Sequence, residues 1–307
     1  GNSLIWGTES PEINQTFNYR TLFSILGASI QKETTMPFSL NNLPERSQKP
    51  RDKGITLVLD KGYSVRQTED FCEVSADYVD VVKLGWGTSY VTPNLEAKLD
   101  VYKNAGIPVY FGGTLFEAYL LRNQLDSYIK LLNRYNIEHV EVSNGTIWIS
   151  DEKKQKIIKD LSADFTVYSE VGSKNPNEII PPYKWVKVIQ EELEAGSSKV
   201  ICEARESGTV GVFRPNGEVR SGLIEEITDQ ISQDKLIFEA PKKAQQVWFI
   251  RKYGSNVNLG NIQPDEAIPL ETLRLGLRGD TLLDFYSLDG EHEVDRVIKE
   301  NSISNEE

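Results

Sequence analysis

The chain has 307 residues, of which 34 are Lys or Arg and 46 are Asp or Glu, so its formal net charge is -12. This acidic balance, without an offsetting Lys/Arg-rich block, argues against a nucleic-acid or anionic-membrane surface. No stretch reaches the roughly 18 apolar residues that a membrane span needs. We therefore expect a cytoplasmic protein with small-molecule substrates, and its assembly as a homo-oligomer is left open.

The two ends of the chain differ from its centre. Residues 1–35 precede the only methionine, Met36, and show no sustained hydrophobic period. We expect them to be an extension, a fragment boundary or translated upstream sequence that is not catalytic. Residues 286–307 are interpreted as an acidic helix or frayed tail. The single catalytic domain is then expected over 36–285.

The centre of the chain repeats one unit eight times: a short β-branched run that ends in charged or amide residues, followed by a stretch long enough for a helix. Eight such units in succession predict an α/β protein, a single closed (β/α)₈ TIM barrel. The runs are 55–62, 78–89, 107–114, 139–146, 165–174, 199–208, 236–241 and 255–261.

Carboxylates follow four successive predicted strands. In a barrel the carboxyl ends of the strands form the active-site face, so these side chains should converge. Converging carboxylates repel each other unless a divalent metal or a cluster of Lys or Arg lies among them. Mg²⁺ is the cation that oxygen ligands favour, whereas two histidines make a zinc site improbable. The four residues are Glu141, Glu170, Glu203 and Glu239.

Cations also lie at or just beyond the strand ends, where they could bind a phosphate or carboxylate of a substrate or form internal ion pairs. Glycine-rich turns at 85–89, 111–114 and 258–261 offer backbone N–H groups to an anion. We place the last of these after strand eight, the usual phosphate position of a barrel. The cations are Lys61, Lys83, Lys174, Arg205 and Arg278.

Cysteine usage is sparse. Cys72 falls in a predicted helix and Cys202 in a predicted strand, where a thiol serves as a small apolar side chain. A reducing compartment fits this pattern.

Six strings resemble the phosphosulfolactate synthase family: KLGWGTS (83–89), GGTLFE (112–117), EARESG (203–208), FEAPKKAQQVWFI (238–250), NVNLGNI (256–262) and LETLRLGLRGDT (270–281). The resemblance covers about residues 50–282. It implies a (β/α)₈ barrel that adds sulfite to phosphoenolpyruvate with Mg²⁺, giving (2R)-phospho-3-sulfolactate, and a link to coenzyme M biosynthesis.

The resemblance also implies roles for individual residues. Lys174 matches a lysine that the family places at the end of strand five, and we expect it to protonate C2, with burial and neighbouring cations lowering its pKa. The other catalytic candidates are Glu170, Lys83 and Arg205, and the metal candidates are Glu141, Glu170 and Glu203. The substrate-binding candidates are Asp60, Lys61, Gly113, Thr114, Glu239, Asn258, Gly260, Asn261 and Arg278.

Two positions depart from the family pattern. The family commonly has Asp-Gly after strand four, where this chain has Asn144-Gly145, and Pro-Gly-Gly after strand three, where Phe111 replaces the proline. Asn144 removes a charge near the expected active site.

Two other functions stay open. The chain could be a non-catalytic or divergent, stress-associated relative of the synthase, because a fold alone does not fix an activity. It could also be a Schiff-base aldolase that uses Lys83 or Lys174 as its nucleophile.

Overall fold

The computed structural model describes residues 40–174 and 180–285. The chain divides into two compact units, residues 1–41 and 42–307. Only Leu40 and Asn41 of the first unit are described, so the expected extension over 1–35 lies outside the described residues, as does the expected tail over 286–307.

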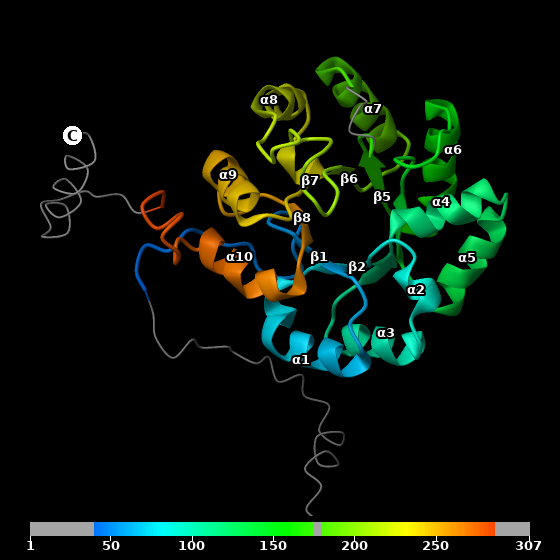
Figure 1. Cartoon of the computed structure of the whole chain (residues 1–307), viewed down its shortest axis with the longest axis horizontal. Coiled ribbons are helices and arrows are strands. Elements are labelled where there is room, and N and C mark those ends of the chain that lie inside the picture. Colours follow the sequence, from blue (N-terminus) through cyan, green and yellow to red (C-terminus); the bar gives the residue numbers. More distant parts are fainter. Residues whose placement is uncertain (1–39, 175–179, 286–307) are drawn as a thin grey trace, which may run out of the picture. The chain divides into compact units, whose positions relative to one another are not determined.

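Eight parallel strands form one sheet in the order β3-β2-β1-β8-β7-β6-β5-β4. Strand β1 pairs with both β2 and β8, so the first and last strands of the sequence are neighbours. Strands β3 and β4 contact each other at the remaining junction. The helices ring the strands (Figure 1), and the predicted (β/α)₈ barrel is confirmed. The strands are β1 Thr56–Asp60, β2 Val81–Leu84, β3 Val109–Phe111, β4 His139–Val142, β5 Thr166–Val171, β6 Lys199–Cys202, β7 Leu236–Glu239 and β8 Leu259–Ile262.

Helices connect the strands, with two between β2 and β3 and two between β3 and β4. They are α1 Val65–Ser75, α2 Thr88–Val91, α3 Leu95–Asn104, α4 Gly113–Leu121, α5 Leu125–Arg134, α6 Asp151–Leu161, α7 Pro182–Glu194, α8 Ser221–Gln230, α9 Lys243–Tyr253 and α10 Ala267–Arg274. Local sequence sets several of their starts: Ser64 and Gln67 form a capping box at α1, and the Ser150 hydroxyl accepts the N–H of Lys153 at α6.

The strands are buried on both faces, because helices cover the outside of the barrel and layered side chains fill the inside. Every residue of β1, β2, β3, β7 and β8 is buried. Cys72 lies in α1 and Cys202 in β6, both as buried free thiols, as the sequence predicted.

Strand β8 begins at Leu259, later than the sequence predicted. Asn258 therefore precedes the strand and lies at the amino end of the barrel, opposite to the end where substrates bind. Its Oδ1 accepts the N–H of Ile55 at 2.9 Å, and its Nδ2 donates to the carbonyl of Leu236 at 2.9 Å. Both partners stand where a strand begins. Asn258 therefore ties the amino ends of the strands together, and its expected place after strand eight is wrong.

Candidate active site

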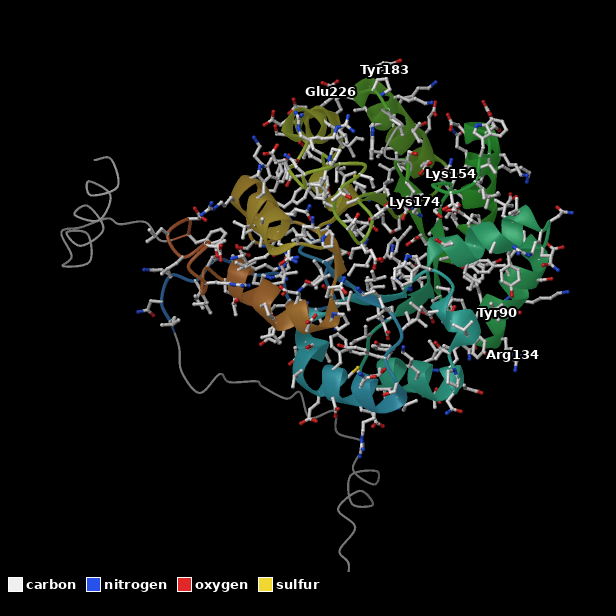
Figure 2. The ribbon with its side chains drawn as sticks, viewed as in Figure 1. Tyr90, Arg134, Lys154, Lys174, Tyr183 and Glu226 are labelled. Atoms are coloured by element: carbon white, nitrogen blue, oxygen red, sulfur yellow. The ribbon has the colours of Figure 1, made fainter. Side chains whose placement is uncertain are left out.

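A cavity of about 400 Å³ opens at the carboxyl ends of the strands. We call it the pocket. In Figure 2, Lys174 lies within the ring of helices, whereas Tyr90, Arg134 and Tyr183 lie at its periphery. The pocket is lined by Leu59, Lys83, Trp86, Gly112, Gly113, Thr114, Glu141, Thr146, Glu170, Lys174, Glu203, Arg205, Glu206, Ser207, Glu239 and Asn261.

Lys83, on β2, places its ammonium group among three carboxylates. Its Nζ is 3.1 Å from Glu141 Oε2, 3.2 Å from Glu239 Oε1 and 4.0 Å from Glu170 Oε2. Burial opposes the charged form of this lysine, but the carboxylates, Glu141 first among them, outweigh burial and raise the pKa of Lys83 well above its ordinary value. Lys83 is therefore held in its ammonium form and lines the pocket.

Lys174, beyond the end of β5, is a second ammonium group among carboxylates. Its Nζ is 2.8 Å from Glu170 Oε1, 3.5 Å from Glu203 Oε2 and 3.8 Å from Glu117 Oε1. Burial would lower the pKa of Lys174, but Glu170 and Glu203 outweigh it, so the pKa is raised. The expectation of a lowered pKa is wrong, because carboxylates rather than cations surround the amine.

Three of the carboxylates share one arrangement. Each uses one oxygen to accept a backbone N–H and turns the other toward a lysine of the pocket. The backbone bonds run from Gly113 N to Glu141 Oε1 at 2.8 Å, from Arg205 N to Glu203 Oε1 at 2.6 Å and from Ala204 N to Glu239 Oε2 at 2.9 Å. The backbone thus fixes the direction in which each remaining oxygen points.

Glu170 and Glu203 are hydrogen-bonded to each other, and their pKa values are shifted in opposite directions. Burial opposes ionisation of Glu170, but Lys174 and Lys83 outweigh it and lower its pKa to about 2. For Glu203, burial and the charges of Glu170 and Glu239 act together and raise its pKa well above the usual value. The opposite shifts make Glu170 the more acidic member of the pair and Glu203 the carboxyl group that binds a proton first.

Most of the predicted residues meet in the pocket. Those that line it are Lys83, Gly113, Thr114, Glu141, Glu170, Lys174, Glu203, Arg205, Glu239 and Asn261. Asp60, Lys61, Asn258, Gly260 and Arg278 are not among the lining residues.

Asp60 is committed to the structure of the barrel. Its Oδ1 accepts the N–H groups of Gly62 and Tyr63, both at 2.8 Å. Its Oδ2 accepts the hydroxyl of Tyr102 at 2.8 Å and lies 2.6 Å from Lys98 Nζ. The fully buried carboxylate therefore fixes the turn after β1 and faces α3 instead of the pocket.

The remaining three candidates that do not line the pocket lie in different places. Lys61 is largely exposed and pairs with Glu206 at 3.6 Å. Gly260 lies inside β8, in register with Glu239. Arg278 follows α10 and lies 3.7 Å from Asp280, which also pairs with Lys243 at the start of α9. The strand-end pattern did not distinguish these residues from those of the pocket.

Four lining residues carried no prediction, namely Leu59, Thr146, Glu206 and Ser207, whereas Trp86 and Gly112 fall within the glycine-rich turns that were expected to offer N–H groups to an anion. The sequence marks Trp86 by the glycines on both sides of it, and in the structure its φ is +51°. That conformation is strained for a bulky residue. Gly112 makes room for it, since a Cβ there would lie 2.5 Å from the Trp86 backbone nitrogen.

The two departures from the family pattern lie outside the pocket. Asn144 lines a neighbouring cavity of about 340 Å³, together with Trp148 and Lys154 among others. Phe111 is fully buried in β3 and packs its ring edge-on against Tyr135.

In the described part of the chain, no group of three or more His, Cys, Asp or Glu side chains is gathered as ligands around a metal usually are. The lysines provide the counter-charge that the sequence allowed as an alternative to a metal. Glu141 Oε2 and Glu203 Oε2 are nevertheless buried and accept no hydrogen bond of ordinary geometry. Both oxygens lie near ammonium groups, at 3.1 Å from Lys83 Nζ and 3.5 Å from Lys174 Nζ, so a hard cation would have to compete with the lysines for them.

Fold and pocket together define a (β/α)₈-barrel enzyme whose active site combines the ammonium groups of two lysines with buried carboxylates. Residues 44–280 match the family model for (2R)-phospho-3-sulfolactate synthase (ComA). Phosphosulfolactate synthase of Bacillus subtilis is 44% identical over 247 residues, which cover 80% of this chain and 98% of that protein. The synthase of Methanothermobacter thermautotrophicus is 44% identical over 246 residues, covering 78% and 95%. The chain belongs to the phosphosulfolactate synthase family, whose members form a carbon–sulfur bond.

A more distant relative is Protein HEAT-STRESS-ASSOCIATED 32 of Arabidopsis thaliana, 20% identical over 261 residues, which cover 75% of this chain and 88% of that protein. Among the described residues, no helix is both long and apolar enough to cross a membrane.

Proposed function

We propose that this chain is a working phosphosulfolactate synthase, which adds sulfite to C3 of phosphoenolpyruvate with Mg²⁺ and forms (2R)-phospho-3-sulfolactate. The observation that carries the proposal is the pair of ammonium groups in the pocket, that of the buried Lys83 and that of the half-buried Lys174, in a chain 44% identical to curated synthases. The two free thiols of this chain, Cys72 and Cys202, suit a reducing cytoplasm.

The reaction joins two anions. The sulfur lone pair of sulfite forms a bond to C3, and the electrons of the C2–C3 double bond move toward the substrate carboxylate as an enolate-like anion. Lys83 and Arg205 line the pocket and would stabilise this negative charge. The phosphate ester remains intact, and one proton must still be added to C2.

Lys174 is the proposed source of that proton. Its raised pKa keeps it as an ammonium ion, so it carries a proton before the reaction begins. The enolate-like carbon is a strong base and takes this proton, which leaves a neutral amine for solvent to reprotonate. The same raised pKa, shared by Lys83, disfavours a Schiff-base aldolase, which needs a neutral amine as nucleophile.

Glu141, Glu170 and Glu203 are the proposed residues for Mg²⁺. When bound, Mg²⁺ supplies a Lewis acid that stabilises the charge developing on the substrate carboxylate. The fit rests on charge. Four buried carboxyl groups, the three proposed ligands and Glu239, face two lysines. Glu203 would give up its proton on binding the cation.

Other pocket residues are proposed to hold the substrate phosphate and carboxylate. Asn261 lies on β8 with a φ of +54°, is buried and lines the pocket, where its Nδ2 amide group would donate to an anion. Thr114 and Arg205 line the same cavity. Gly113 acts differently from the expectation, because its N–H already binds Glu141, and a Cβ there would lie 2.3 Å from the Glu141 carboxylate.

Phosphorus NMR of the protein with phosphoenolpyruvate, sulfite and Mg²⁺ tests this function. We expect a new phosphomonoester signal that requires all three additions and disappears in excess chelator. The Lys174→Met variant, which keeps a long side chain but loses the ammonium group, should form no product while remaining folded by circular dichroism. If the natural chain consumes no phosphoenolpyruvate, the non-catalytic alternative replaces this proposal.

A further inference from the structure

The loop after β4, residues 143–147, packs against both Lys174 and α4. We call it the clamp loop. Glu117 of α4 is 1% exposed and accepts three hydrogen bonds from this loop. The donors are Ser143 Oγ to Oε1 at 2.6 Å, Thr146 N to Oε2 at 2.9 Å and Ile147 N to Oε2 at 3.0 Å. One buried carboxylate thus fixes both ends of the loop.

Gly145, in the middle of the clamp loop, lies directly on the side chain of Lys174. A Cβ placed on Gly145 would lie 3.0 Å from Lys174 Cγ, 3.0 Å from Cδ and 3.2 Å from Cε, and these are its three nearest neighbours. The absence of a side chain at Gly145 therefore leaves a slot that the stem of the lysine fills. Carboxylates hold the other end of this side chain, at Nζ.

We propose that the clamp loop, held by Glu117, positions Lys174 and thereby decides which face of C2 receives the proton. Glu117 and Gly145 are positioning residues in this account, and Lys174 is the catalytic residue. The inference rests on the proposed function for its chemistry, but the placement of Lys174 can be measured without turnover.

Glu117 acts chiefly through the loop, since its three bonds to the loop are shorter than its 3.8 Å separation from Lys174 Nζ. In Glu117→Gln, the amide oxygen can still accept the N–H groups of Thr146 and Ile147, and its NH₂ group can donate to Ser143. In Glu117→Ala all three bonds are lost. The two variants therefore separate the loop contacts from the negative charge.

The first measurement uses the side-chain nitrogen NMR signal of the Lys174 ammonium group, assigned by its loss in Lys174→Met. We expect this signal to shift or broaden in Glu117→Ala and Gly145→Ala and to stay in place in Glu117→Gln. Gly222→Ala in α8 is the matched control, because a Cβ there meets no atom within 4 Å. Unchanged signals in both Glu117→Ala and Gly145→Ala would overturn the inference.

The second measurement is turnover with the configuration of the product, read by chiral chromatography after removal of the phosphate. A misplacement of about 1 Å at a reacting group can lower a rate by about a hundredfold. For the smaller shift in Gly145→Ala we expect kcat to fall about tenfold, with KM within about threefold. Protonation by water should then add (2S) product.

Glu117→Ala should behave like Gly145→Ala, and Glu117→Gln should stay within about threefold of the natural chain. Equal damage in the Gln and Ala variants would overturn the route through the loop. If the natural chain forms no product, the proposed function fails, and the NMR signal still decides whether the clamp loop positions Lys174.

Discussion

Single residues of the pocket differ in protonation although they share one chemistry. Glu170 and Glu203 are both buried glutamates on adjacent strand ends, yet the pKa of Glu170 is lowered and that of Glu203 is raised. The difference follows from position: Lys174 Nζ lies 2.8 Å from Glu170 and 3.5 Å from Glu203. One proton shared between two carboxyl groups lets both point into the same cavity.

The raised pKa of Glu203 predicts how stability depends on pH. Above the ordinary value of 4.5 the unfolded chain releases this proton and the folded chain keeps it. The folded state then binds more protons, so its stabilisation is complete at low pH and is lost as pH rises toward the folded pKa. Glu203→Gln should remove this component. Urea titrations of both chains from pH 5 to 8 should show the natural chain losing up to about 1.4 kcal/mol per pH unit relative to the variant.

Equal pH slopes for the two chains would contradict the assignment of the proton to Glu203. The comparison with the variant is needed because other buried groups titrate in the same range. Burial lowers the pKa of His139, for example, which makes stability rise with pH and opposes the effect of Glu203.

Residues of the pocket could be predicted from the sequence where they directly follow an apolar strand run. Glu141, Glu170, Glu203 and Glu239 each end an apolar run, and parallel strands bring such ends together. Asp60 satisfies the same rule and yet faces Lys98 and Tyr102. Its partners are about forty residues away in sequence, so no local pattern could reveal that this carboxylate was already paired.

Elements were predicted better than the loops that join them. Seven strands lie within the predicted runs, because a buried parallel strand is a short apolar run with abrupt ends. Strand β8 was the exception, since its polar and glycine residues gave no sharp boundary. Glu117 also escaped prediction, because a glutamate within a predicted helix is usually solvated and only the packing of the clamp loop buries it.

The loop after β4 carries a prediction of its own at Asn144. This residue lines the neighbouring cavity instead of the pocket, so a negative charge there should have little effect on the substrate. We expect Asn144→Asp to change kcat/KM by less than about tenfold, equivalent to about 1.4 kcal/mol in barrier height. Steady-state kinetics of the two chains provide the measurement. Strong activation of Asn144→Asp would mean that the aspartate common in the family takes part in the reaction and that this chain has diverged from the family in activity.

The two ends of the whole barrel have different tasks, with the pocket at the carboxyl end and stabilising contacts at the amino end. Arg274 of α10 is fully buried there. Its Nη1 donates to the carbonyls of Ser255 and Val257, both at 2.7 Å, and its Nη2 donates to the carbonyl of Ile55 at 3.1 Å. These bonds join the segment before β8 to the segment before β1, where the sheet closes between the first and last strands.

Arg274→Met should therefore reduce stability without reducing catalysis. Hydrogen bonds from a charged donor contribute about 1.5–3 kcal/mol each, and the lost carbonyl partners stay buried, so we expect unfolding to become easier by about 3 kcal/mol or more. Urea unfolding measures this loss, and kcat at a temperature where the variant is folded should stay within about twofold. Arg251→Met is the control, because that side chain is largely exposed and pairs with Asp284 at the surface. If kcat of the folded Arg274→Met variant fell well beyond twofold, the amino end of the barrel would also shape the pocket. The reason would be that the pairing of β8 with β1 sets the position of Asn261 on β8.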